Sequence, residues 1–166
     1  MTEREKSDIV YAREMSAFSY FLQMLPDGWT ATRTPGEFDG FDLWTTNNTE
    51  TIAVENKVRD KDADEVRDGG CLINKEKIDN LIATGGKAAV VQYFWKNNET
   101  YVWSISERDT WRTGTIWVKK KNWDDSPYVQ REVYYMPMDA KHRRKNVDLR
   151  DYQARYNHYL KEAQAR

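Results

Sequence analysis

The chain has 166 residues, of which 39% are hydrophobic and 32% charged, and its formal net charge at pH 7 is -1. Seven Trp, ten Tyr and five Phe suffice for a core, so the composition argues against a wholly disordered chain and favours a single domain over residues 1–166. One cysteine, Cys71, excludes a disulfide scaffold and a zinc site built from several thiolates.

The N-terminal sequence, MTEREKSD, is charged and lacks the apolar segment of a secretory signal peptide. The longest nearly continuous apolar run, residues 88–95, is far shorter than the roughly 20 residues that a membrane helix needs. We therefore expect a cytoplasmic, intracellular protein. Acidic side chains outnumber basic ones in residues 1–118, whereas the reverse holds in residues 119–166, and such asymmetry favours contact of the basic part with a polyanion.

The N-terminal region predicts a helix, because apolar residues recur every three or four positions: Tyr11, Met15, Phe18, Leu22 and Leu25. Thr2 and Glu5 have the spacing of a capping box, and the sequence PDG at residues 26–28 predicts the end of the helix. A neighbouring apolar row on this helix contains one charged residue, Glu14.

Segments rich in β-branched and aromatic residues follow, separated by turn residues. The expected strands are, in chain order, 29–33, 41–46, 51–58, 87–95, 101–105, 115–119 and 129–136. Two more helices are expected over 74–84 and 147–163, and the charged residues 59–70 predict a mobile surface loop. This order predicts an α/β fold with a mixed central sheet flanked by helices, plus a C-terminal β-hairpin and helix.

Asp42, Glu55 and Lys57 form the pattern that points to chemistry. Glu55 and Lys57 are two residues apart on a predicted strand, so their side chains share one face. Asp42 lies on the preceding strand, and hairpin-like pairing would bring its carboxylate close to that of Glu55. Two carboxylates suit Mg²⁺, and an adjacent lysine supplies positive charge for a phosphate in its transition state. The pattern is therefore typical of metal-dependent phosphodiester hydrolysis.

Alternatives remain open for these residues. Glu55 and Lys57 are also compatible with a position on the exposed face of an edge strand. Asp39 competes with Asp42 as the first carboxylate, although an offset of three places it on the other side of an extended strand. A second acid-x-Lys sequence, residues 139–141, lacks a strand to orient its side chains.

A family resemblance rests on the helix that carries Glu14 and on five later segments: FDLW, AVENKV, LINKEKIDNL, AAVVQYF and YVWSI. Together with Asp42, Glu55 and Lys57, they resemble the PD-(D/E)xK nuclease superfamily. The resemblance covers about residues 8–105 and implies a restriction-endonuclease-like αβββαβ core there, with residues 106–166 as a C-terminal extension. The chain departs from the family pattern in having no proline directly before Asp42 and the polar Asn56 at a usually apolar position.

The resemblance implies that Asp42 and Glu55 bind a divalent ion, Mg²⁺ or Mn²⁺, with the main-chain carbonyl of Asn56 as a further ligand. Lys57 would position the attacking water, and Glu14 would support the metal site from the first helix. DNA is the implied partner, a homodimer is expected because one such site cuts one strand, and partner proteins could supply specificity. The small, tryptophan-rich chain fits a phage or mobile-element origin.

Basic residues elsewhere predict contacts with DNA phosphates. Lys77 lies on the predicted helix 74–84 and is expected to reach the site or a phosphate. The other candidates are C-terminal: Lys119, Lys120, Lys121, Arg143 and Arg144. Tryptophans recur at six-residue intervals and either close a small core or stack on unpaired bases: Trp111, Trp117 and Trp123.

Three classes of function follow from these observations. The leading one is a metal-dependent deoxyribonuclease that uses Asp42, Glu55 and Lys57. The second is a non-catalytic nucleic-acid-binding or assembly module that keeps the nuclease fold. The third is a tryptophan-rich β-domain for protein contacts.

Overall fold

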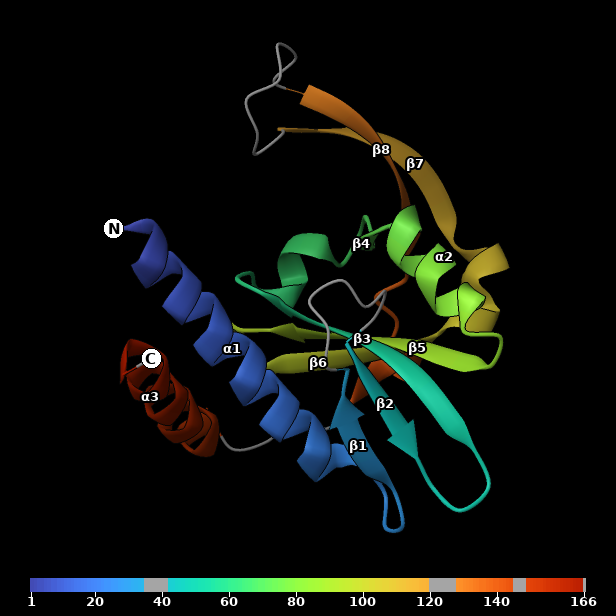
Figure 1. The fold of residues 1–166 in the computed structure, drawn as a ribbon. Coiled ribbons are helices and arrows are strands. Elements are labelled where there is room, and N and C mark those ends of the chain that lie inside the picture. Colours follow the sequence, from blue (N-terminus) through green and yellow to red (C-terminus); the bar gives the residue numbers. More distant parts are fainter. Residues whose placement is uncertain (35–41, 120–127, 145–148, 166) are drawn as a thin grey trace.

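The computed structural model describes residues 1–34, 42–119, 128–144 and 149–165, which form three α-helices and two β-sheets (Figure 1). The predicted α/β architecture, with a mixed central sheet flanked by helices, is confirmed. Within these residues, no helix is both long enough and apolar enough to span a bilayer.

The elements follow the predicted order with two additional short strands, at residues 71–74 and 143–144. In chain order they are α1 (Glu3–Met24), β1 (Thr30–Arg33), β2 (Leu43–Thr46), β3 (Thr51–Arg59), β4 (Cys71–Asn74), α2 (Lys75–Ala83), β5 (Lys87–Phe94), β6 (Glu99–Ser104), β7 (Arg112–Lys119), β8 (Tyr128–Met136), β9 (Arg143–Arg144) and α3 (Leu149–Ala165). Three 3-10 helices lie between them: η1 (Ala63–Val66), η2 (Ile105–Thr110) and η3 (Ala140–His142). The sequence does not predict β4, whose four residues run directly into α2.

The central sheet has the strand order β1-β2-β3-β5-β6-β9, in which β3 and β5 are parallel and all other neighbours antiparallel. Strand β3 is internal, and its alternating side chains pack on both faces of the sheet. On one face Val54 belongs to a cluster with Phe21 of α1 and Val91 of β5. On the other face Ala53 belongs to a cluster with Ile78 of α2. Consequently β3 is held between helices on its two sides.

Helix α1 begins at the predicted capping box, in which the backbone N–H of Glu5 donates to the Thr2 hydroxyl and that of Thr2 donates to the Glu5 carboxylate. Its buried face differs from the predicted apolar stripe, because Leu22 is exposed and Ser19 is buried. Helix α3 explains the difference: it lies alongside α1, and the Tyr159 hydroxyl is 2.7 Å from that of Ser19 (Figure 1). Small and polar side chains therefore form much of this helix contact.

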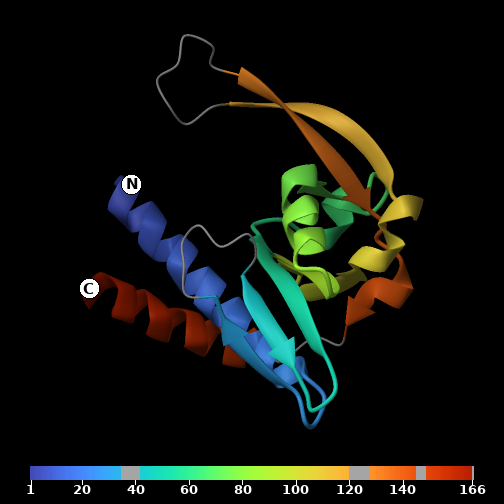
Figure 2. The same cartoon turned by 45° about the vertical axis from the view of Figure 1, so that its right-hand side comes forward.

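A second sheet has the order β4-β8-β7. Its strands β7 and β8 pair antiparallel, as predicted, and form a long curved ribbon, here called the arm (residues 112–119 and 128–136). The arm arches away from the central sheet on the side of the N-terminal end of α1 (Figures 1 and 2). Trp111 is buried at its base, Trp117 is 67% exposed, and Trp123 lies outside the described residues.

Residues 59–70 are ordered differently from the predicted mobile loop. Asp62 and Glu65 form a second capping box at the start of η1, and Ala63 is fully buried. The Arg67 guanidinium donates to Asp64 and is 3.4 Å from a carboxylate oxygen of Glu99 on β6. The prediction was wrong because these charged side chains cap and pair locally instead of being fully solvated.

Cys71 on β4 is buried, and this burial raises the pKa of its thiol to about 11, although Arg59 partly offsets the effect. At pH 8 about one molecule in 1,000 would then carry a thiolate, against about one in four for an exposed cysteine. We expect the native protein to react with a thiol reagent at least about 100-fold more slowly than the unfolded chain, and about tenfold faster per pH unit between pH 8 and 10. Equal rates for the native and the urea-unfolded chain would contradict this prediction.

Candidate active site

Strand β3 places Glu55 and Lys57 on the face that α2 covers. The Glu55 side chain is fully buried, and the Lys57 Nζ lies 3.4 Å from its Oε1. Helix α2 adds a second ammonium group, because the Lys77 Nζ lies 3.6 Å from the same oxygen. The edge-strand alternative is wrong, since β3 has hydrogen-bonded neighbours on both sides and Glu55 is inaccessible to solvent.

The Glu55 carboxylate has an unusual environment. Both of its oxygens are buried and accept no hydrogen bond. Burial raises the pKa of Glu55, the nearby Asp42 raises it further, and Lys57 and Lys77 act in the opposite direction. An ionised carboxylate in this position is costly without strong partners, so the site as built favours an additional cation.

Asp42 faces Glu55 across the β2–β3 pair. Asp42 directly precedes β2, whose first residue pairs with Val54, and the charge of Asp42 raises the pKa of Glu55, so the two carboxylates lie near each other. The backbone N–H of Asp42 donates to the Val54 carbonyl at 3.1 Å, and its carboxylate accepts the backbone N–H of Asn56 at 2.7 Å. The Asp42 carboxylate thus accepts the Asn56 N–H, which in a regular strand pair would be bound by a backbone carbonyl. This hydrogen bond fixes the orientation of the Asp42 side chain.

Asp39, the rival for the first carboxylate, lies outside the described residues.

Glu14 reaches the site from α1. Partial burial of its carboxyl raises the pKa of Glu14, as does Asp42, while Lys57 and Arg33 lower it. Glu14 also lines two neighbouring cavities, one with Lys57 and a smaller one with Asp42. This carboxyl group therefore lies between the lysine and the aspartate of the candidate site.

The larger of these two cavities is a cleft with a volume of about 420 Å³, here called the arm cleft. Its walls come from α1, the end of β3, β4, the start of α2 and the arm strand β7. Glu14, Lys57 and Lys77 line it, and Glu55 is buried directly behind the two lysines. A substrate in the arm cleft would therefore meet both ammonium groups.

The donor set fits one kind of metal ion. Among the described residues, no group of three His, Cys, Asp or Glu side chains is arranged to hold a metal, so a closed side-chain cage of the structural zinc type is not formed there. Two neighbouring carboxylates, one of them buried and paired only loosely with two lysines, instead suit Mg²⁺, which takes one or two carboxylates and keeps several waters.

The predicted DNA contacts are scattered. Lys119 is exposed at the end of β7, and Lys120 and Lys121 lie outside the described residues. Arg143 and Arg144 are on β9, three strands from β3; Arg143 lies 3.1 Å from a carboxylate oxygen of Glu99, and Arg144 donates to the Lys141 carbonyl. Of the members of this group that the structure describes, only Lys77 lies at the carboxylates.

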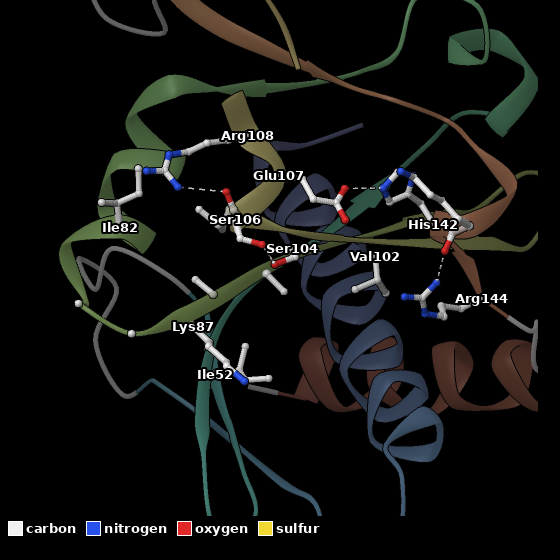
Figure 3. Close-up of a pocket in the computed structure, with 16 residues that line it drawn as sticks. Ile52, Ile82, Lys87, Val102, Ser104, Ser106, Glu107, Arg108, His142 and Arg144 are labelled. Atoms are coloured by element: carbon white, nitrogen blue, oxygen red, sulfur yellow. Dashed lines mark hydrogen bonds and ion pairs between the residues drawn. The ribbon is translucent and has the colours of Figure 1, made fainter. Parts of the chain in front are cut away.

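A second cavity of about 980 Å³ lies where β3 and β5 begin (Figure 3). Ile52 and Val102 belong to its apolar part, and Arg144 lies at its margin. In its lining, the His142 Nε2 lies 2.8 Å from a carboxylate oxygen of Glu107. Neither Asp42 nor Glu55 lines this cavity, which separates it from the candidate active site.

Sequence reasoning missed Arg59 and Gln92. The Arg59 guanidinium donates to the Gln92 side-chain oxygen at 2.6 Å and to the Leu72 carbonyl at 2.8 Å. Gln92 is fully buried and lies opposite Lys57 in the β3–β5 register. Arg59 continues the alternation of Glu55 and Lys57, so strand parity was the signal that could have identified it. These bonds tie the end of β3 to β5 and β4.

Comparisons with known proteins give limited information. No protein-family model matches the sequence, and a search of curated proteins finds no match. Among solved structures, the chain is similar to Hjc, a Holliday junction resolvase from the archaeal hyperthermophile Archaeoglobus fulgidus, with a TM-score of 0.38 and 17% sequence identity. The alignment covers 49% of this chain and 68% of that chain. A likeness of this extent does not assign the chain to that protein's family.

Proposed function

We propose that the protein is a metal-dependent nuclease of the PD-(D/E)xK type that hydrolyses DNA phosphodiester bonds. The observation that carries this proposal is the buried Glu55 carboxylate, which has no hydrogen bonds, faces Asp42 and lies beside two lysines. The charge of Asp42 raises the pKa of Glu55, so the two carboxylates repel each other, and a divalent cation held by both would remove the repulsion. Lysines beside a metal are the groups that phosphodiester hydrolysis requires.

In this proposal Asp42 and Glu55 hold Mg²⁺ or Mn²⁺, and the main-chain carbonyl of Asn56 is the further ligand. The bound ion would act as a Lewis acid on the phosphate and lower the pKa of a water molecule. The hydrogen bond from the Asn56 backbone holds Asp42 in place for this role.

Side chains that line the arm cleft would bind the phosphate and orient the attacking water. The Lys57 ammonium group is about one third exposed, so it can contact both the Glu55 carboxylate and a phosphate oxygen. It stabilises the negative charge that develops on the phosphate and orients the attacking water. Lys77 offers a second contact to a phosphate oxygen. Glu14 accepts a hydrogen bond from a water molecule in the cleft and so restricts its position.

Cleavage of DNA in the presence and absence of Mg²⁺ tests the proposal. Wild-type protein is expected to cleave with Mg²⁺ and not with EDTA, and Asp42→Asn is expected to lose at least about 100-fold in rate, the scale seen when one charge-stabilising group is removed. Asp79→Asn is the matched control, because Asp79 is an exposed carboxylate whose partner is Lys75. It should retain wild-type activity.

Equal cleavage by wild type and Asp42→Asn would contradict the site. DNA binding without cleavage by any variant would favour the non-catalytic binding module instead. DNA is the partner in either case, whereas the homodimer, protein partners, phage origin and cytoplasmic location stay predictions.

A further inference from the structure

We propose that the arm cleft accepts a single nucleic-acid strand with unpaired bases, and that a continuous duplex does not enter it. This inference rests on the proposed function and names the form of its substrate. Four observations on the cleft support it: the chemistry of its walls, the engagement of its arginines, its volume and the bracing of the arm.

Apolar side chains face one another across the cleft. Val10 of α1 lines one wall and is 52% exposed. Ile116 and Val118 line the opposite wall, on the arm. Charged and polar side chains line other parts of the cleft, whereas these aliphatic side chains suit the faces of nucleobases, which are planar and largely apolar.

The arginines in the walls are engaged within the protein. Arg13 lies 3.4 Å from Asp60 and its guanidinium stacks over the Trp95 ring at 5.3 Å. Arg59 is bound by Gln92 and the Leu72 carbonyl. The two lysines that line the cleft have longer ion pairs, at 3.4 and 3.6 Å from the same Glu55 oxygen, and their side chains are more than one third exposed, so they can also meet a phosphate.

This distribution matches one strand better than two. A duplex presents two phosphate backbones, and proteins that bind it place cations and polar donors along both. Here Lys57 and Lys77 lie together at the base of the cleft, and the arm contributes the apolar side chains of Ile116 and Val118 to its wall. A single strand would set one phosphate against the lysines and its base between Val10 and the arm.

The volume leads to the same conclusion. About 420 Å³ lies within the range of roughly 300–1,000 Å³ that pockets for small ligands have, so the cleft holds a nucleotide-sized group. The major groove alone of a duplex is about 12 Å wide, and a complete duplex needs a much broader channel.

Strand β7 of the arm, whose inner face lines the cleft, is packed against Tyr135 of β8. The Tyr135 ring packs over Gly114, where an added Cβ would lie 2.9 Å from the ring, and the Arg112 guanidinium lies 3.9 Å from the ring centre. Gly114, Ile116 and Val118 are every second residue of β7, so their side-chain positions lie on one face of the arm, the face that lines the cleft. Trp117 consequently lies on the outer face, away from the cleft.

Binding of fluorescein-labelled DNA in EDTA, where no metal-dependent cleavage occurs, tests the inference. We expect a short single-stranded oligonucleotide to bind at least about tenfold more tightly than a blunt duplex of the same sequence, because the base of a single strand can bury its face against the apolar side chains. Ile116→Ser and Val118→Ser should each weaken single-strand binding about fivefold and leave duplex binding unchanged.

Two further variants distinguish a loss of apolar contact with the strand from a loss of folding. Val118→Thr has nearly the same shape as the wild type and should keep the fold while still weakening single-strand binding. Trp117→Ser, one residue away on the outer face, is the matched control and should have no effect. A stronger effect at Trp117 than at Val118, or a duplex that binds as tightly as the single strand, would overturn the inference.

The outcome is separable from that of the nuclease proposal. A protein that prefers single strands in EDTA but never cleaves with Mg²⁺ would contradict the nuclease and support the assignment of the cleft. A protein that cleaves duplex DNA and binds both forms equally would support the nuclease and overturn the inference.

Discussion

Replacing Glu55 by glutamine is expected to abolish two properties together: cleavage, by at least about 100-fold, and the stabilisation of the fold by Mg²⁺ or Mn²⁺. The metal-free variant should be as stable as the wild type or more stable by about 1 kcal/mol, because the substitution removes a buried charge. A loss of activity with unchanged or higher stability is the result expected when a functional group is held in the fold at a cost to stability.

The physical reason lies in the surroundings of this side chain. Without metal, the Glu55 carboxylate is buried, makes no hydrogen bonds and faces Asp42, so its charge opposes folding despite the two nearby lysines. With metal, the same two oxygens become ligands. Glutamine keeps the shape of the side chain and removes its charge. The substitution therefore removes both the cost of burying the charge in the metal-free protein and the stabilisation that the charge provides when it binds metal.

Thermal unfolding with and without metal measures this effect. At a metal concentration 100 times the Kd, wild type should gain about 2.7 kcal/mol, which for a chain of this size raises Tm by about 5–10 °C. Glu55→Gln should show no rise, whereas Glu76→Gln, an exposed carboxylate on α2, should behave as wild type. A full metal-induced rise in Glu55→Gln would show that Glu55 is not a ligand.

The two lysines are expected to differ in importance. Lys57→Ala should lower the cleavage rate at saturating Mg²⁺ by about 100-fold to 1,000-fold, because its ammonium group is held on an internal strand next to Glu55. Lys77→Ala should lose about tenfold, mainly through weaker binding, and should reduce the salt dependence of binding by about one phosphate contact.

Lys75→Ala provides the control for both. Lys75 is two residues before Lys77 on α2, but its ammonium pairs with Asp79 at 2.9 Å, away from the carboxylates. Its removal should change the rate less than about twofold, as is usual for an exposed pair. If Lys57→Ala and Lys75→Ala cleave at the same rate, the role given to Lys57 is wrong.

Local sequence rules predicted the parts of the fold that depend on neighbours along the chain. The capping box at Thr2, the alternation along β3 and the helix with Ile78 each follow from residues within one turn or one strand. The facing positions of Asp42 and Glu55 also followed, because a short connection allows only an antiparallel pairing of the two strands.

Distant contacts were beyond those rules. The apolar spacing predicts that Leu22 is a core residue, but it is exposed. Helix α3 covers a different side of α1, where the Ser19 hydroxyl contacts that of Tyr159. Strand β4 is too short to register as a pattern and exists because β8 pairs with it. Likewise nothing local shows that Val118, more than 60 positions after Lys57, lines the same cleft.

The pairing of α1 with α3 has a consequence for the entropy of the site. Glu14 is carried by α1, and α1 packs against α3, which lies more than 120 positions later in the sequence. A contact between segments so far apart closes a long loop of chain, and the contact must offset the entropy lost in that closure. Weakening the α1–α3 contact would therefore loosen the helix that carries Glu14 and widen the range of positions open to its carboxyl group.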